Sequence, residues 1–185
     1  KVNGKLLYVA DSANTATSMA TGEITSRGRI GTSAGDDRDL TNIVELADAA
    51  GYRTGIVSTA SITDATPASF VAHINKRFCE NPEAMVDVSY GDILLGDCSQ
   101  DLKANGGKGS ISEQLAESSV QVLLGGGSKH FAPQAEGQTV SVAQLAQDKG
   151  FLLVSDAGEL KAAAIGQRLL GLFSPDTMPV RLLWE

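Results

Sequence analysis

The stretch Val120-Gln121-Val122-Leu123-Leu124 is a short apolar run between two amphipathic segments, and it decides the fold class. The segment before it, 112–118, and the segment after it, 142–149, carry apolar residues at helical spacing. Further elements are predicted as a strand at 151–154, a helix at 159–165 and a final strand at 169–173. Strands that alternate with helices in this way predict an α/β fold with a mostly parallel sheet sandwiched by helices.

The N-terminal half continues this alternation. Its predicted elements are a strand at 6–10, a helix start at 12–19, a helix at 41–50, a buried strand at 54–59 and a helix that opens at 66–67. Thr41 and Thr66 are the predicted N-caps. Pro67 takes the first helical position, and Gly51 is the expected stop of the helix before it. The Gly- and Asp-rich segment 31–39 is expected to be a mobile insertion.

The charge balance disfavours nucleic acid as a partner. The 185 residues include 22 acidic and 15 basic side chains, which gives a formal net charge of −7 and a pI near 4.8. Non-specific affinity for nucleic acid comes mostly from Lys and Arg side chains that neutralise phosphates. An anionic substrate would therefore need a local positive centre, such as an arginine or a metal.

The two ends predict a piece of a longer protein rather than a whole one. No window approaches 18 uninterrupted apolar residues, so no segment is expected to span a bilayer. Residues 1–5 have no initiating Met and are not followed by the apolar region of a signal peptide. Residues 180–185 are still apolar, whereas natural termini are usually solvated.

Two glycine-rich segments resemble a P-loop and a dinucleotide-binding fingerprint, but each lacks a residue that the motif requires. Lys108 is followed by Gly109, where a P-loop requires Ser or Thr. Gly125-Gly126-Gly127 follows a predicted strand, but the third glycine of a dinucleotide-binding fingerprint would fall at His130. We interpret both segments as structural turns.

Ser12 stands at the end of the first predicted strand, in the sequence Asp11-Ser12-Ala13-Asn14-Thr15-Ala16-Thr17. The small residues after it would leave its hydroxyl accessible and let a ligand approach the backbone. A helix N-terminus also presents N–H groups and a dipole that favour an anion. Alternatively, Ser12 is an ordinary N-cap.

Cys79 and Cys98 flank a segment with Pro82 and two glycines, which is predicted to be a loop. A disulfide that closes such a loop would contribute about 3 kcal/mol in the loop-entropy model and would imply an oxidising compartment. Alternatively, the two residues are unpaired thiols in the cytosol.

An ordered set of motifs resembles the bacterial alkaline phosphatase family. The first are Asp11-Ser12-Ala13 and Asp64-Ala65-Thr66-Pro67-Ala68, followed by a Val71-Ala72-His73 helix and Arg77. The later motifs are Gly106-Gly107-Lys108-Gly109-Ser110-Ile111, Glu113-Gln114-Leu115, Leu124-Gly125-Gly126-Gly127, Leu170-Gly171-Leu172-Phe173 and Met178-Pro179-Val180-Arg181. The resemblance covers nearly the whole chain. It implies an incomplete alkaline-phosphatase-like core, with residues 1–185 as a single α/β fragment of a larger phosphatase domain.

The resemblance implies a role for each matching residue. Ser12 would be the nucleophile, forming a phosphoserine and facing a zinc ion. Asp11 would orient Arg77, whose planar guanidinium would grip two phosphate oxygens. Thr66 would supply a hydroxyl to a magnesium site, and Asp64 would lie beside that magnesium.

The resemblance also implies that Cys79 and Cys98 form a disulfide, in a periplasmic or secreted protein. Each other role has a plain alternative: Asp64 and Thr66 are turn and cap residues, and Arg77 satisfies carbonyls at a helix end.

The two histidines match no motif of the family. His73, in an apolar helix, is expected to be packed. His130, beside Lys129 in a turn, is expected to be solvated.

The implied function is hydrolysis of phosphate monoesters, with inorganic phosphate as product, by a parent protein that carries two zinc ions and one magnesium and forms a homodimer. Most metal ligands of the family fall outside this chain. We therefore expect the isolated chain to be inactive, because without zinc the hydroxyl of Ser12 stays neutral.

The alternative is a catalytically silent α/β fragment that binds cations or phosphate. The net charge of −7 and the cluster Asp36, Asp37 and Asp39 support that alternative.

Overall fold

The computed structural model describes residues 9–90 and 93–180. Its central feature is a four-stranded parallel sheet with strand order β1-β4-β6-β5. The strands are β1 (Gly55–Ser61), β4 (Val122–Gly126), β5 (Phe151–Val154) and β6 (Arg168–Leu172). The predicted α/β fold with a mostly parallel sheet is confirmed. The strand predicted at 6–10 falls largely outside the described residues, and residues 9 and 10 are not in a strand.

The middle strands β4 and β6 carry the core of the sheet. Leu123 and Leu170 are register partners on these strands, and both are fully buried. At the edge, the residues of β1 alternate between exposed and half-buried until Ser61, which is buried. The guanidinium of Arg168 ties the start of β6 to the segment before β4, because it donates to the carbonyl of Val120 at 3.1 Å.

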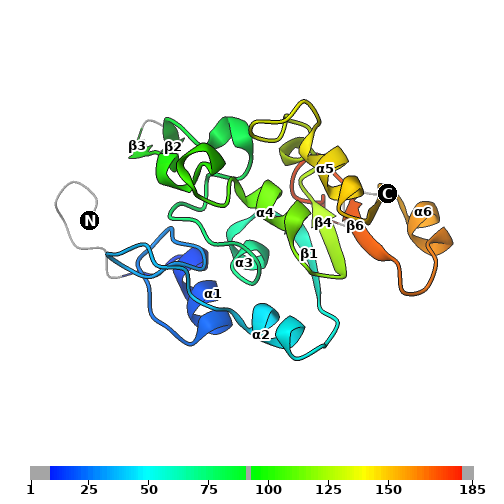
Figure 1. Cartoon of the computed structure of the whole chain (residues 1–185), viewed down its shortest axis with the longest axis horizontal. Helices are drawn as coiled ribbons and strands as arrows, with labels where there is room; N and C mark the ends of the chain where they lie inside the picture. Colours follow the sequence, from blue (N-terminus) through cyan, green and yellow to red (C-terminus); the bar gives the residue numbers. More distant parts are fainter. Residues whose placement is uncertain (1–8, 91–92, 181–185) are drawn as a thin grey trace.

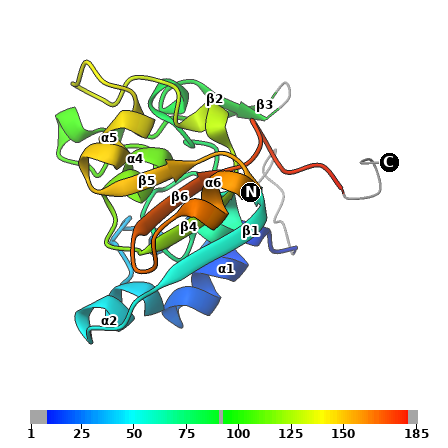
Figure 2. The ribbon, with the colours of Figure 1, turned by 90° about the vertical axis from the view of Figure 1, so that its right-hand side faces the viewer.

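Helices cover both faces of this sheet. They are α1 (Ser12–Thr21), α2 (Ile43–Ala49), α3 (Ala65–Ala68), α4 (Ile111–Glu117), α5 (Val142–Asp148) and α6 (Ala157–Ala162). Figure 1 and Figure 2 show α6 on one face and α3 and α4 on the opposite face. Within the described ranges, no helix has the length and apolar character needed to cross a membrane.

Two predicted N-caps are wrong by one or two residues. The side chain of Asn42, not that of Thr41, caps α2 by accepting from two backbone N–H groups at 3.0 Å. The side chain of Asp64, not that of Thr66, caps α3, so Pro67 lies inside that helix rather than at its first position. Asn and Asp are stronger N-caps than Thr. The stronger cap follows the predicted one at α2 and precedes it at α3.

The C-terminal elements lie close to their predicted ranges. β5 has the predicted bounds. α4 and β6 are each shifted by one residue at both ends, and α5 ends one residue earlier than predicted. Helix α6 begins two residues earlier than predicted, because Asp156 caps it by accepting from the N–H groups of Gly158 and Glu159 at 2.7 and 2.9 Å.

The segment 31–39, predicted to be a mobile insertion, is a closed turn. Thr32 and Asp39 form an isolated antiparallel bridge, and the N–H of Leu40 donates to the carbonyl of Gly31 at 2.8 Å. Thr32 is almost fully buried. The turn is therefore anchored at its base, and its mobility stays a prediction.

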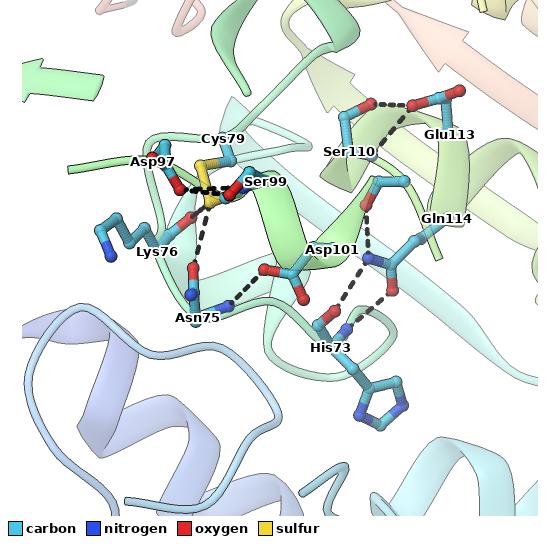
Figure 3. The surroundings of a disulfide bond; sticks show 12 residues. His73, Asn75, Lys76, Cys79, Asp97, Ser99, Asp101, Ser110, Glu113 and Gln114 are labelled. Atoms are coloured by element: carbon cyan, nitrogen blue, oxygen red, sulfur yellow. Dashed lines mark hydrogen bonds between the residues drawn. A yellow bond between two sulfur atoms is a disulfide. The ribbon is translucent and has the colours of Figure 1, made fainter. Parts of the chain in front are cut away.

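Cys79 and Cys98 form a disulfide, as the family resemblance implied. Figure 3 shows the bond beside Asn75 and Lys76, on the segment that leads to Arg77. Both cysteines are fully buried, so the cross-link belongs to the core. The residues between them are not a plain loop, because they contain the antiparallel strands β2 (Val88–Tyr90) and β3 (Ile93–Gly96).

Replacing both Cys79 and Cys98 by Ser is expected to lower the free energy of unfolding by about 3 kcal/mol, the loop-entropy value for a loop of this size. The bond joins residues with a sequence separation of 19. Without it, this loop of the unfolded chain gains conformational freedom, which favours unfolding. Urea unfolding of the variant and of the wild type, each with and without a thiol reductant, measures the loss. An unchanged free energy of unfolding would contradict the prediction, and reduced wild type should match the variant.

Candidate active site

Ser12 is the first residue of α1, and Asp11 is the N-cap of that helix. The carboxylate of Asp11 accepts from the N–H of Asn14 at 3.1 Å, and the Asn14 side chain accepts in return from the N–H of Asp11 at 2.9 Å. This capping box fixes the entry of the chain into the helix. The Ser12 hydroxyl is exposed beside helix N–H groups that have no partner within the helix.

Small side chains hold α1 against α3. Ala13 and Ala16 on α1, and Ala65 and Ala68 on α3, are all buried. The hydroxyl of Ser69 lies 3.4 Å from the carbonyl of Ala13, at the junction of the two helices. Because none of these alanines extends beyond Cβ, the two helix starts come close enough to share one partner.

That shared partner is Arg77. Its Nη1 donates to Oγ of Ser12 at 2.5 Å, and its Nη2 donates to Oδ1 of Asp64 at 2.7 Å. Oδ2 of Asp11 lies 3.8 Å from Nη1. The structure thus brings four of the predicted site residues together: Asp11, Ser12, Asp64 and Arg77.

The closer carboxylate partner of Arg77 is Asp64, which sequence reasoning had placed only beside a metal. Asp11, the predicted orienting residue, makes the longer ion pair. The side chain of Asp64 remains 44% exposed, while that of Arg77 is 19% exposed. Thr66, exposed on α3, stands two residues beyond Asp64. Oxygen atoms from this turn are therefore open to solvent.

The formal charges of this group do not favour an anion by themselves. Arg77 brings one positive charge, whereas Asp11 and Asp64 bring two negative charges, so the three groups sum to −1. A phosphate dianion would gain the two N–H donors of the guanidinium, but it would also meet two carboxylates. Phosphate binding by these residues alone is therefore expected to be weak.

The two histidines lie outside this group, and part of the expectation for each of them was wrong. His73 is buried as predicted, with Nδ1 and Nε2 each 2.9 Å from an acceptor, the carbonyl of Gly31 and Oε1 of Glu45 respectively. It is not in a helix, because α3 ends at Ala68. His130 was predicted to be solvated, yet it is only 7% exposed.

His130 is buried because the turn after β4 is packed under the exit of β6. The N–H of Gly127 donates to the carbonyl of Ser174 at 2.9 Å, and the next side chain, that of Phe131, is fully buried. Nδ1 of His130 lies 3.0 Å from the side-chain amide of Asn81. Its Nε2 lies 3.2 Å from Oε2 of Glu80.

This environment keeps His130 neutral. An amide that donates to Nδ1 leaves the ring proton on Nε2, which then donates to Glu80. Burial is the main cause that lowers the pKa of His130 to about 4. The nearby charge of Lys129 contributes to this shift, and that of Asp176 opposes it. Burial also raises the pKa of Glu80 above its ordinary value, although the hydrogen bond from Thr63 opposes that shift.

His130 is therefore expected to titrate near pH 4 in the folded protein and near pH 6.5 in the unfolded chain. Because the unfolded state takes up this proton first, the contribution of His130 to stability is complete above pH 6.5. It is lost as the pH falls from 6.5 towards 4. NMR titration of the His130 ring, in buffer and in urea, measures both values. A folded-state pKa of 6 or higher would contradict the prediction.

The aspartates that suggested a cation site are engaged with other groups. Asp37 pairs with Arg29, and Asp39 lies 2.7 Å from Nζ of Lys108. The carboxylate of Asp36 accepts from a serine hydroxyl, and this hydrogen bond lowers its pKa. Within residues 9–90 and 93–180, no group of three or more His, Cys, Asp or Glu side chains is arranged to hold a metal ion.

Fold and site together define an α/β protein with an exposed serine at a helix start beside a paired arginine. The family model described as alkaline phosphatase matches residues 1–184. The chain therefore belongs to the alkaline phosphatase family.

Three similar proteins show how far the likeness extends. The alkaline phosphatase of Escherichia coli strain K12 is 43% identical over 189 residues, which cover 99% of this chain and 38% of the relative. Streptomycin-6-phosphate phosphatase of Streptomyces griseus is 42% identical, over 96% of this chain and 38% of its own length. A solved structure of a TAB5 alkaline phosphatase mutant with Mg bound in the M3 site has a TM-score of 0.67 at 28% identity, over 92% of this chain and 41% of that one. The chain spans about 38% of the length of the curated relatives.

Sequence reasoning missed one residue that touches this site. Gly28 contacts both Asp11 and Arg77 through its backbone. A backbone contact leaves no signature in residue chemistry. The only available signal was a glycine in a polar segment, Ser26-Arg27-Gly28-Arg29, which many turns share.

Proposed function

We propose that this chain is the nucleophile-bearing part of a phosphoric monoester hydrolase. The observation that carries the proposal is the 2.5 Å contact between Arg77 Nη1 and Ser12 Oγ at the start of α1. A phosphate placed between these two groups would meet the planar donor fork of an arginine and the positive end of a helix. Membership of the alkaline phosphatase family supports the same reaction.

In this reaction Ser12 is the nucleophile. Its Oγ forms a bond to phosphorus while the bond between phosphorus and the ester oxygen breaks. The hydroxyl proton of Ser12 ends on that leaving oxygen, so the products are a phosphoserine and an alcohol. Water then hydrolyses the phosphoserine and releases inorganic phosphate. Arg77 binds two of the phosphate oxygens, and Asp11 and Asp64 hold its guanidinium in place.

The described residues do not fit a zinc site. Zinc takes nitrogen, sulfur or carboxylate ligands, usually four in number, but both histidines have other partners and both cysteines form the disulfide. Asp64 and Thr66 offer the oxygen ligands that magnesium prefers, and magnesium supplies positive charge when bound. They are only part of such a site. The TAB5 alkaline phosphatase mutant with Mg bound in its M3 site supports a metal cofactor for the parent protein.

The remaining ligands for two zinc ions and one magnesium would come from the rest of a longer parent. A parent of this kind acts on phosphate monoesters, forms a homodimer and resides in the periplasm or is secreted. The disulfide between two buried cysteines supports an oxidising compartment.

Arg77→Ala is expected to weaken the binding of inorganic phosphate to the chain by about tenfold to a hundredfold, because hydrogen bonds to a charged group are worth about 1.5–3 kcal/mol. Arg77→Lys should be intermediate, since an ammonium keeps the charge but loses the fork. NMR titration with inorganic phosphate measures the affinities. Arg38→Ala removes an arginine that is 57% exposed and serves as the matched control. Equal affinities for Arg77→Ala and wild type would refute the role of Arg77.

The 185-residue chain alone is expected to hydrolyse 4-nitrophenyl phosphate negligibly, even with added zinc and magnesium. Within the described residues, Oγ of Ser12 has one hydrogen bond, to a guanidinium that cannot accept a proton. The hydroxyl therefore stays neutral. Release of nitrophenolate is compared between the wild-type chain and Ser12→Ala. Robust turnover that depends on Ser12 would show that the chain is sufficient for catalysis.

A further inference from the structure

Gly28 lies between the two ends of the pair formed by Asp11 and Arg77. Its N–H donates to Oδ2 of Asp11 at 3.1 Å, and its carbonyl accepts from the backbone N–H of Arg77 at 2.7 Å. The same Oδ2 is the atom that lies 3.8 Å from Nη1 of Arg77. One residue thus orients the carboxylate and also anchors the backbone from which the guanidinium extends.

The segment that follows Gly28 is itself fixed to the core. Ile30 and Ile74 exchange two backbone hydrogen bonds of 3.0 and 2.8 Å, and both side chains are fully buried. Oγ1 of Thr17, a buried residue of α1, donates to the carbonyl of Arg29 at 3.1 Å and accepts from the N–H of Gly31 at 3.0 Å. The position of Gly28 is therefore set by the helix that starts at Ser12 and by the segment that leads to Arg77.

The backbone of Gly28 has φ of +81°, a conformation that side chains with a Cβ rarely adopt. No heavy atom lies within 4 Å of the place where a Cβ would stand. A substitution at this position would therefore act through the backbone conformation and not through a clash. Gly51, which follows α2, has φ of +79° and equally open surroundings, so it offers a matched control away from the site.

We propose that Gly28 is a positioning residue for Arg77. Its N–H and carbonyl set the separation between the Asp11 carboxylate and the Arg77 backbone, and so place the guanidinium over Ser12. The inference rests on the proposed function in assigning phosphate to Arg77. It adds a residue whose role depends on a left-handed backbone conformation and on no side chain.

The test compares Gly28→Ala, Gly28→Asn and Gly51→Ala in the 185-residue chain. Inorganic phosphate affinity is measured by NMR titration, together with the Arg77 Nε–Hε resonance in the absence of phosphate and the melting temperature. Gly28→Ala should weaken phosphate binding about fivefold or more, because a left-handed conformation is costly for Ala. Gly28→Asn should stay within about twofold of wild type, since Asn tolerates positive φ. Gly51→Ala should lower the melting temperature alone.

The proposal is overturned if Gly28→Ala binds phosphate like wild type and leaves the Arg77 Nε–Hε resonance unchanged. It is also overturned if Gly51→Ala weakens phosphate binding as much as Gly28→Ala does. Failure of the proposed function gives a different result, in which the wild-type chain shows no response of Arg77 to phosphate. In that case the Nε–Hε resonance decides the role of Gly28, because it reports the pairing of Arg77 with Asp11 and Asp64 without phosphate.

Discussion

The guanidinium of Arg77 joins parts of the chain that are distant in sequence, and the geometry of the site depends on it. One nitrogen reaches Ser12 at the start of α1, and the other reaches Asp64 at the start of α3. The residues of the first contact are 65 positions apart. Such a contact forms only after α1 has packed on α3, and that packing is close because alanines such as Ala13 and Ala65 line it. The site is thus a product of helix packing more than of local sequence.

The same pairing limits what the site can do alone. Two carboxylates hold one guanidinium, which gives a precise orientation and a local charge of −1. The chain as a whole carries −7, so neither the local nor the global field attracts a phosphate dianion. Additional positive charge near the exposed Asp64 would reverse the local balance. In a longer parent, bound cations could supply that charge without disturbing the contacts of Arg77 with Ser12 and Asp11.

The sequence predicted the fold well where the hydrophobic periodicity was strong. It predicted helix caps and the burial of single polar residues less well. The strand 151–154 has its predicted bounds because it is a continuous apolar run between polar turns. The N-caps at Asn42 and Asp64 were missed because a threonine one or two residues away is also an acceptable cap, and the stronger caps Asn and Asp were selected. His130 was misjudged because Lys129 beside it suggested solvent. The ring contacts Asn81 and Glu80, and the turn that carries it is bonded to residues after β6, so its partners are all distant in the sequence.

The chemistry of the site was predictable in a different way. Motifs named Ser12, Asp11, Asp64 and Arg77, and the structure brings these four together. What the motifs did not contain was the support of the site, since Gly28 contributes two backbone atoms and no side chain. A side-chain pattern records the atoms that meet a substrate, whereas the atoms that hold those side chains in place are largely backbone. For this reason a motif can identify the reacting groups of an enzyme while their separation, which decides whether they can react, follows only from the three-dimensional structure.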